Sequence, residues 1–214
     1  APARDAVAAG DASTSPSDAA RQQRGGADDS PRALEVLREE ALGCTKCRLH
    51  EDRRNVVFGE GAEDADVVVV GEAPGREEDR TGRPFVGPAG KLLDLLLLSV
   101  GLPRERVFIC NVLKCRPPKN RDPRPDEVEC CSPYLRRQLE VISPRVLLAV
   151  GRFAAQTLSD SDESIGRLRG RVHTYRGIPL VASYHPAYLL RSPNQVQRTW
   201  EDFQLMRQVL DERA

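Results

Sequence analysis

Four short apolar runs, separated by helical patterns, constrain the fold of this chain most strongly. They lie at residues 67–70, 107–110, 146–150 and 180–184, and each is short enough to form one buried strand. Residues 88–100, 125–141 and 152–158 between them have helical start and stop signals. Regular alternation of strands and helices predicts an α/β fold of three layers, α/β/α, around a central four-stranded parallel sheet.

The segments outside this alternation have simpler expectations. A helix over residues 31–42 is predicted to follow an N-cap at Ser30 and to end before Gly43, which brings the chain to Cys44. Residues 171–178 predict a small hairpin into the last strand. Residues 196–210 predict a final helix whose apolar face packs on the core.

Composition separates the first 30 residues from the rest. This segment is rich in Ala, Ser, Gly and Asp, and Val7 is its only sizeable aliphatic side chain. Such a segment buries too little apolar surface to offset the entropy of ordering. We therefore predict a disordered tail over residues 1–30 and a single domain over residues 31–214.

Charge and hydropathy exclude several classes of protein. The 32 basic and 32 acidic residues give no net charge, which argues against a generally polycationic protein that coats nucleic acid. No run approaches the roughly 20 apolar residues of a membrane span, and residues 1–30 lack the apolar block of a secretory signal. The sequence also gives no signal for a dimer. We expect a cytoplasmic monomer without a membrane partner.

Polar residues follow the predicted strands at the point where each strand ends. Glu72 follows the first strand, Asn111 the second and His185 the last, and Gly71 and Gly151 accompany them. Each polar residue alone fits an ordinary surface position. Ligands of open α/β sheets bind outside the carboxyl ends of the strands, so the three together indicate one site.

Six cysteines are the other unusual feature. Thiols of a cytoplasmic protein stay reduced, which favours metal binding or burial over disulfides. Cys44 and Cys47 form a C-x2-C pair, Cys115 lies 68 positions after Cys47, and the adjacent Cys130 and Cys131 follow, of which one is expected to be a bystander. Four thiolates suit zinc or an iron–sulfur cluster, although zinc ribbons usually have two such pairs. Cys110 lies within an apolar run and is interpreted as a core residue.

Four further stretches carry a family resemblance. GEAPGREED (71–79) follows the first strand, GRPFVG (82–87) precedes a helix, NVLKCRPPKNR (111–121) follows the second strand, and HPAYLLR (185–191) follows the last. The nucleotide motifs G-x-x-x-x-G-K-[ST] and G-x-G-x-x-G are absent from the sequence. Together these stretches resemble family 4 of the uracil-DNA glycosylases, the iron–sulfur branch of that superfamily, from about Cys44 to near Leu210.

The resemblance implies a cofactor and a set of site residues. A [4Fe–4S] cluster would be held by Cys44, Cys47, Cys115 and Cys131, with zinc as the alternative occupant. Catalytic roles would fall to His185, as a hydrogen-bond donor to uracil O2, and to Glu72, as the group that positions water or stabilises the sugar cation. The expected substrate-binding residues are Gly71, Ala73, Phe85, Asn111, Glu78 and Asn120.

Three of these assignments carry a chemical argument. The amide of Asn111 can donate and accept, which matches uracil O4 and N3–H, whereas cytosine reverses both. Phe85 can stack on an extruded base or simply fill the core. Ala73 stands where other branches of the superfamily carry an aspartate that helps to activate water, so the identity of the water-activating group stays open.

DNA contacts are expected from an apolar wedge and from basic loops. Leu189, or alternatively Leu190, would fill the vacated base stack, and Arg191 would contact a phosphate. The proline-rich stretch over residues 110–131 would present a basic edge, which is made of Lys114, Arg116, Lys119, Arg121 and Arg124. A second basic surface is predicted from Arg167, Arg169, Arg171 and Arg176, because that segment contains no acidic residue.

The resulting functional hypothesis is a glycosylase that hydrolyses the bond between uracil and deoxyribose in single- or double-stranded DNA and leaves an abasic site. A glycosylase for another deaminated base uses the same fold and remains an alternative. A non-catalytic iron–sulfur DNA-binding module is a third, although pure binding needs neither Glu72 nor His185.

Overall fold

The computed structural model describes residues 30–213, so the predicted tail lies outside the described residues except for Ser30. Its centre is a six-stranded sheet in the order β1-β3-β2-β4-β6-β5. β3, β2, β4 and β6 run parallel, which confirms the predicted four-stranded sheet, and β1 and β5 add an antiparallel strand at each edge. The strands are β1 Glu60–Gly61, β2 Val67–Gly71, β3 Phe108–Asn111, β4 Val146–Val150, β5 Val172–Tyr175 and β6 Ile178–Ser183.

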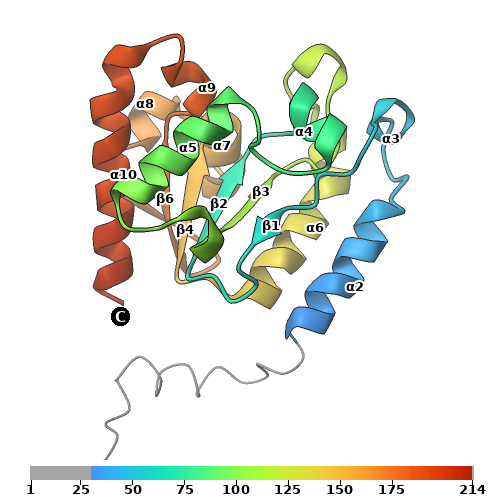
Figure 1. Cartoon of the computed structure of the whole chain (residues 1–214), viewed down its shortest axis with the longest axis horizontal. Coiled ribbons are helices and arrows are strands. Elements are labelled where there is room, and N and C mark those ends of the chain that lie inside the picture. Colours follow the sequence, from blue (N-terminus) through green and yellow to red (C-terminus); the bar gives the residue numbers. More distant parts are fainter. Residues whose placement is uncertain (1–29, 214) are drawn as a thin grey trace, which may run out of the picture.

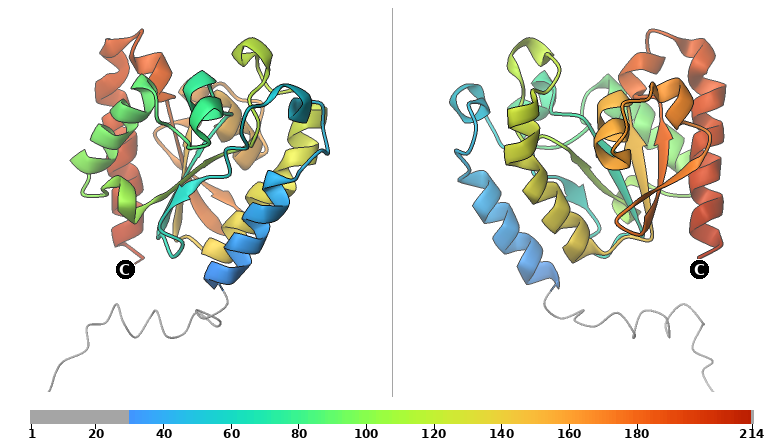
Figure 2. Two further views of the ribbon diagram at one scale, coloured as in Figure 1. Left: turned by 45° about the vertical axis from the view of Figure 1, so that its right-hand side comes forward. Right: turned by 180° about the vertical axis from the view of Figure 1, so that it is seen from behind.

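Helices cover both faces of this sheet (Figure 1). α5 (Pro88–Ser99) and α10 (Val196–Asp211) lie on one face. α2 (Ser30–Leu42) and α6 (Pro125–Ile142) lie side by side on the other face in each view of Figure 2, together with α7 (Arg152–Ser159). The shorter helices are α3 Leu49–Asp52, α4 Arg76–Thr81, α8 Ile165–Leu168 and α9 Pro186–Leu189, and 3₁₀ turns lie at Arg104–Arg106, Pro118–Asn120 and Pro193–Gln195.

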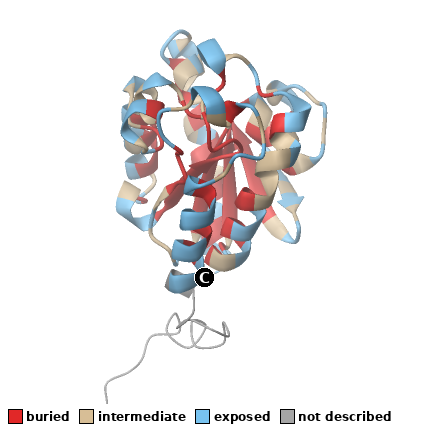
Figure 3. Cartoon of the chain, turned by 90° about the vertical axis from the view of Figure 1, so that its right-hand side faces the viewer, coloured by how far each residue is buried: buried red, intermediate tan, exposed pale blue. Residues whose placement is uncertain are grey.

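Alternation along the strands divides the core into two clusters. Val68 and Val70 of β2 point toward α2 and α6, whereas Val67 and Val69 point toward α5 and α10. All four are buried because a parallel sheet is covered on both faces. Figure 3 shows these buried strands between helices whose outer faces are exposed.

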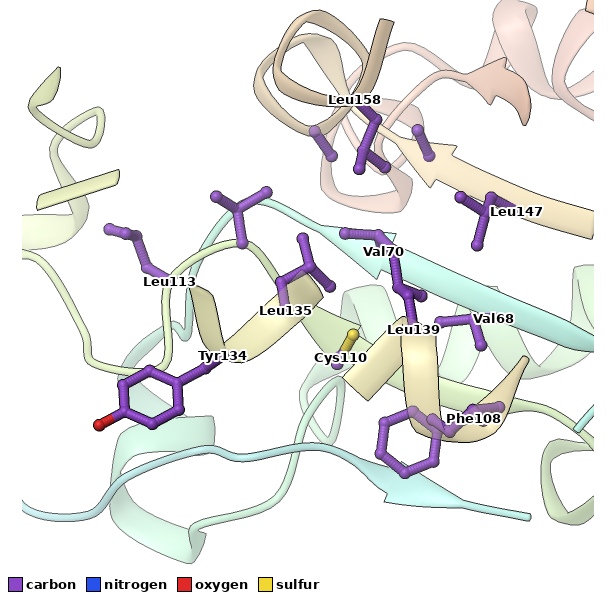
Figure 4. Packing of buried hydrophobic residues seen from close by; sticks show 14 of the residues in the cluster. Val68, Val70, Phe108, Cys110, Leu113, Tyr134, Leu135, Leu139, Leu147 and Leu158 are labelled. Carbon is purple, nitrogen blue, oxygen red and sulfur yellow. The ribbon is translucent and has the colours of Figure 1, made fainter. Parts of the chain in front are cut away.

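The cluster under α6 shows how a strand residue that looks chemically reactive can be structural. Phe108 and Cys110 of β3 point toward Leu135 and Leu139 of α6 (Figure 4). Cys110 is fully buried, which confirms its interpretation as a core residue. Its thiol is therefore separate from the other five cysteines.

The predicted hairpin is β5 and β6, which turn at Arg176 and Gly177, both of which have positive φ. The two-residue strand β1 was not predicted, because Glu60 and Gly61 have no apolar alternation. Within residues 30–213, the helices are all too short or too polar to span a membrane.

Candidate active site and cysteine site

A cavity of about 400 Å³ opens at the carboxyl ends of the parallel strands. Nine of the residues singled out in the sequence line it, although they come from five separate segments of the chain. They are Glu72, Ala73, Glu78, Phe85, Asn111, Asn120, Arg121, His185 and Arg191. We call this cavity the base pocket. The parallel strands bring Glu72, Asn111 and His185 together, as the sequence argument anticipated.

Asn111 and Phe85 both approach the backbone of Gly71 at the end of β2. A Cβ on Gly71 would come within 2.4 Å of Asn111 Oδ1 and 2.7 Å of the Phe85 ring, so no larger residue fits there. Asn111 is 2% exposed, and its Oδ1 is one of two buried side-chain polar atoms within residues 30–213 that have no hydrogen-bond partner. A buried oxygen without a donor costs about 1 to 3 kcal/mol. The base pocket therefore contains an acceptor suited to a ligand N–H group.

The loop that carries Phe85 is clamped from two sides. The carboxylate of Glu78 accepts the backbone N–H groups of Val86 (3.0 Å) and Gly87 (3.2 Å). Arg104 donates to the carbonyl oxygens of Phe85 (3.2 Å) and Pro84. These contacts hold Phe85 at a φ of 51°, an uncommon value for a residue with a Cβ.

Arg104 was not predicted, because in the sequence it looks like any solvated charge in a loop. It also forms ion pairs with Glu60 (2.7 Å) and Asp94 (2.9 Å), so its side chain is held rigidly between β1 and α5. Glu78 was expected near the substrate. Its hydrogen bonds assign it first to positioning the Phe85 loop.

His185 is the N-cap residue of α9, and one hydrogen bond defines the tautomer of its imidazole. Its Nδ1 accepts the backbone N–H of Ala187 at 3.1 Å. A neutral imidazole that accepts at Nδ1 carries its proton on Nε2. Burial lowers the pKa of His185 to about 4, the nearby Glu78 opposing and Arg191 adding to this shift, so the ring is neutral near pH 7.

Two neighbours fix the position of the His185 ring. The Phe85 ring is stacked against it with centroids 5.6 Å apart and 29° between the planes. Gly151 has a φ of 98°, and a Cβ there would come within 3.1 Å of the His185 side chain. The glycine after β4 therefore gives the imidazole its space in the base pocket.

Glu72, directly after β2, is the second titratable group of the base pocket. Burial raises its pKa, Asp122 adds to the rise and Arg152 opposes it. Arg152 and Asp122 are themselves paired at 2.8 Å. Glu72 is therefore a partly desolvated carboxylate whose ionisation depends on a charge pair at the rim.

The proline-rich loop lies at the mouth of the base pocket. Lys119 and Asn120 both have a φ of 55°, and Asn120 Oδ1 accepts from Arg116 at 2.7 Å. Arg121 lines the pocket, but its guanidinium binds both carboxylate oxygens of the buried Glu127. Lys119 is exposed and lies outside the lining.

The choice of Leu189 as the apolar wedge is wrong. Leu189 is 1% exposed and packs in the cluster of α5 and α10, so it cannot enter DNA without leaving the core. Leu190, the residue that caps the C-terminal end of α9, is 51% exposed. The side chain of Leu190 faces solvent at the end of this short helix, and the sequence alone does not give that orientation.

The two predicted basic surfaces are smaller than the sequence indicated. Lys114 is buried rather than part of an exposed edge. In the second segment, Arg169 binds Asp202, Arg171 binds Glu163 and Arg176 lies 3.8 Å from Glu140. Glu163 lies just before this segment, and folding brings Asp202 and Glu140 from distant parts of the chain, so the absence of an acid within residues 167–176 was misleading.

Five cysteines line a second, smaller cavity of about 20 Å³ between α2, α6 and the loop after β3, which we call the cysteine site. They are Cys44, Cys47, Cys115, Cys130 and Cys131. Burial raises the pKa of Cys47, Cys115 and Cys131, the last to about 12.

Protein N–H groups already point at two of these sulfurs. Arg53 donates to Cys115 Sγ at 3.3 Å and also to the carbonyl of Cys44 at 2.7 Å. The backbone N–H of Lys114 donates to Cys131 Sγ at 3.2 Å. Such donors stabilise thiolates.

The donor set of the cysteine site fits a group that binds several thiolates. Cys130 differs from the others, because its Sγ donates outward to the carbonyl of Lys46 at 3.4 Å. Within residues 30–213, no three His, Cys, Asp or Glu side chains are arranged to hold a single metal ion. Four thiolates can hold either an iron–sulfur cluster or a zinc ion.

Comparison with known proteins agrees with this geometry. The model of the Uracil DNA glycosylase superfamily matches residues 58–204. A Type-4 uracil-DNA glycosylase from Archaeoglobus fulgidus is 48% identical over 179 residues, which cover 80% of this chain and 90% of that protein. Type-4 enzymes from Thermotoga maritima (47% identical, 77% of this chain and 88% of that protein) and Sulfurisphaera tokodaii (43%, 83% and 84%) are similar as well. The chain therefore belongs to the uracil-DNA glycosylase superfamily, among relatives of the fourth type.

Proposed function

We propose that this chain removes uracil from DNA by hydrolysing its N-glycosidic bond, which leaves an abasic site for base excision repair. Its similarity to Type-4 uracil-DNA glycosylases over most of the chain supports this reaction. The observation that carries the proposal for the site is the buried, unpartnered Oδ1 of Asn111 in a pocket that also contains a neutral His185.

Uracil recognition would depend on the Asn111 amide. Its Oδ1 would accept uracil N3–H, and its Nδ2 would donate to O4. Cytosine presents an acceptor at N3 and a donor at the 4-amino group, so it would leave both amide atoms unsatisfied. Phe85 would pack against the extruded base, and the clamp made by Glu78 and Arg104 would hold its ring in place before the base arrives.

His185 would stabilise the leaving group. Cleavage of the glycosidic bond develops negative charge on uracil, part of it on O2. The Nε2–H of His185 would donate to that oxygen, and the hydrogen bond would strengthen as the charge grows. The backbone N–H of Ala187 fixes the required tautomer. The imidazole can act without being protonated, which suits its pKa of about 4.

Glu72 would act at the sugar. Its carboxylate would position the attacking water or stabilise the positive charge that develops on deoxyribose. The neighbouring Ala73 has no polar side chain, which leaves Glu72 as the titratable group of the base pocket next to it. Glu72 would then supply the negative charge that the aspartate at the position of Ala73 supplies in other branches of the superfamily.

Contacts to DNA would surround the mouth of the base pocket. Leu190 would enter the stack that uracil leaves, and Arg191, which lines the pocket, would reach the phosphate beside it. Lys119 would contact a second phosphate from the stiff proline-rich loop. This set is small, so binding would depend on salt less steeply than in proteins with a broad basic face.

A [4Fe–4S] cluster fits the cysteine site, with Cys44, Cys47, Cys115 and Cys131 as ligands and Cys130 as bystander. Bound there, the cluster would supply covalent cross-links between the end of α2 and the loop after β3. This would hold the proline-rich loop beside the base pocket. A single zinc ion is the alternative occupant.

The test uses a uracil-containing oligonucleotide followed by alkali, which breaks the strand at abasic sites. The wild-type protein should cause breakage at uracil and no breakage at cytosine. Asn111→Asp should lower the ratio of uracil to cytosine excision by about a hundredfold, because a carboxylate cannot donate to O4. Gln204→Glu makes the same amide-to-acid change on the exposed face of α10 and should behave as wild type.

Three results would contradict the proposal. DNA binding without breakage would indicate a non-catalytic module. Breakage only at another deaminated base would indicate a different substrate. Unchanged uracil selectivity in Asn111→Asp would exclude the Asn111 amide as the group that recognises uracil.

A further inference from the structure

Lys114 lies between the base pocket and the cysteine site and contacts residues of both. Its backbone N–H donates to Cys131 Sγ (3.2 Å), and its Nζ donates to the backbone carbonyl of Asn111 (2.8 Å). Nζ also donates to Oε1 of Gln138 at 2.6 Å, and Gln138 Nε2 donates to the carbonyl of Phe58 at 2.9 Å. One side chain therefore connects the strand end that presents Asn111 to the helix that carries Cys131.

The burial of this ammonium requires an explanation. Lys114 is 2% exposed, and both acceptors of its Nζ in the described part of the chain are uncharged oxygens. A fully buried lysine is rare unless a charge compensates it, because removing an ammonium from water costs several kcal/mol. Lys114 also lines the cysteine site, where four thiolates would carry the missing negative charge.

The hydrogen bond to Asn111 has a separate effect. Asn111 is the last residue of β3, and the N–H of Val112 is bound to the carbonyl of Gly71 (2.9 Å). Lys114 satisfies the Asn111 carbonyl beyond the point where the strand ladder stops. Both groups of the peptide unit that follows Asn111 are therefore hydrogen-bonded, which fixes the backbone directly after the Asn111 side chain.

We propose that Lys114 is a positioning residue that couples the two sites: its ammonium provides the counter-charge for the cluster-bound thiolates, and its hydrogen bond holds the backbone that presents the Asn111 amide. This inference rests on the proposed function, since it needs both a cluster at the cysteine site and base recognition by Asn111. It assigns two separable properties, charge and hydrogen bonding, to one buried side chain.

Three variants separate these properties. Lys114→Met keeps the apolar stem but removes both the charge and the donor. Lys114→Gln removes the charge and keeps a donor on a side chain one atom shorter. Gln138→Leu keeps the charge but removes the acceptor and leaves the Phe58 carbonyl unpaired, so it serves as the control for simple damage to the core.

The first measurement is the half-life of the visible absorbance in excess iron chelator, well below each unfolding midpoint. Lys114→Met and Lys114→Gln should both lose iron about tenfold faster than wild type, because the thiolates lose their counter-charge. Gln138→Leu should lose iron at nearly the wild-type rate even if its unfolding midpoint falls. Equal rates in Lys114→Gln and Gln138→Leu would overturn the role of the charge, and this comparison holds even if Lys114→Met does not fold.

The second measurement is the ratio of uracil to cytosine excision by cluster-loaded protein. It should fall in Lys114→Met and be partly restored in Lys114→Gln, since the amide can still donate to the Asn111 carbonyl. The wild-type ratio in Lys114→Met would overturn the coupling to Asn111. A wild-type protein without iron or without uracil excision would instead refute the proposed function, which distinguishes the two failures.

Discussion

The base pocket and the cysteine site lie close together but satisfy their polar groups in opposite ways. The base pocket is open, about 400 Å³ in volume, and leaves Asn111 Oδ1 without a partner. The cysteine site is about 20 Å³, and protein N–H groups already bind the sulfurs of Cys115 and Cys131. Unsatisfied atoms in a roomy cavity suit a ligand that comes and goes. Sulfurs that already accept protein N–H groups suit thiolates that stay bound within the fold.

Replacing His185 should produce the largest change and should separate the two sites most clearly. His185→Ala removes the proposed donor to uracil O2, so we expect kcat to fall by about a hundredfold to a thousandfold with little change in KM. Single-turnover excision of uracil measures this effect. The visible absorbance should remain, because His185 lies outside the cysteine site. A wild-type rate, or loss of the absorbance together with the rate, would contradict this separation.

Adjacent cysteines provide the second test. Cys131→Ala removes a proposed ligand that is partly buried and accepts the backbone N–H of Lys114, so we expect loss of bound iron and a fall of roughly 10 °C in the unfolding midpoint. Cys130→Ala is the matched control, because its sulfur faces the Lys46 carbonyl. Iron analysis and thermal unfolding measure both effects. The opposite result would exchange the ligand assignment of the two cysteines.

The neighbouring leucines at the C-terminal end of α9 should have different effects, one on stability and the other on DNA processing. Leu189→Ala opens a cavity in the core and should lower the free energy of unfolding by about 2 to 5 kcal/mol. Leu190→Ala should leave stability nearly unchanged and lower excision from duplex DNA by about tenfold, with a smaller effect on single strands. Denaturant unfolding and excision from both substrates measure these effects. Equal excision by Leu190→Ala on both substrates would exclude the wedge.

The sequence predicts the sheet and the base pocket well for a physical reason. Continuous apolar runs such as residues 146–150 identify buried parallel strands, and the carboxyl ends of such strands meet at one edge of the sheet. Glu72 follows β2 directly, Asn111 is the last residue of β3 and His185 lies two residues after β6, so a correct prediction of the strands also brings these three residues together. Phe85 needed the family resemblance, because nothing in its loop indicates where the ring points.

Orientation and long-range charge pairing could not be predicted. Leu189 and Leu190 are adjacent and identical residues, yet they point in directions about 100° apart, and only tertiary packing decides which one is buried. Lys114 was predicted to be part of an exposed basic edge, but it is buried and donates to Gln138, which lies 24 positions later in the chain. Arg104 resembles a surface charge in the sequence, but in the structure it donates to the carbonyl oxygens of Phe85 and Pro84. Such features depend on tertiary contacts that local patterns do not encode.

The pH dependence should give the smallest effect and should test the electrostatics of the base pocket alone. In the proposed mechanism Glu72 is ionised when it acts at the sugar, and burial raises its pKa above the ordinary 4.5, with Asp122 adding to the rise. The rate should therefore fall as the pH decreases through a value above 4.5, before protonation of His185, with its pKa of about 4, contributes. Glu72→Gln should abolish this first acid limb at a lower overall rate.

Replacing Asp122 should move the same acid limb of the pH profile in a direction that the structure predicts. Asp122→Asn removes a negative charge that raises the Glu72 pKa and frees Arg152, whose positive charge lowers it. Both changes favour the ionised carboxylate, so the acid limb should move to lower pH. Asp126→Asn, on the exposed first turn of α6, should leave the limb in place. Profiles of kcat/KM between pH 4 and 7 measure the shift, and movement to higher pH in Asp122→Asn would assign the limb to a group other than Glu72.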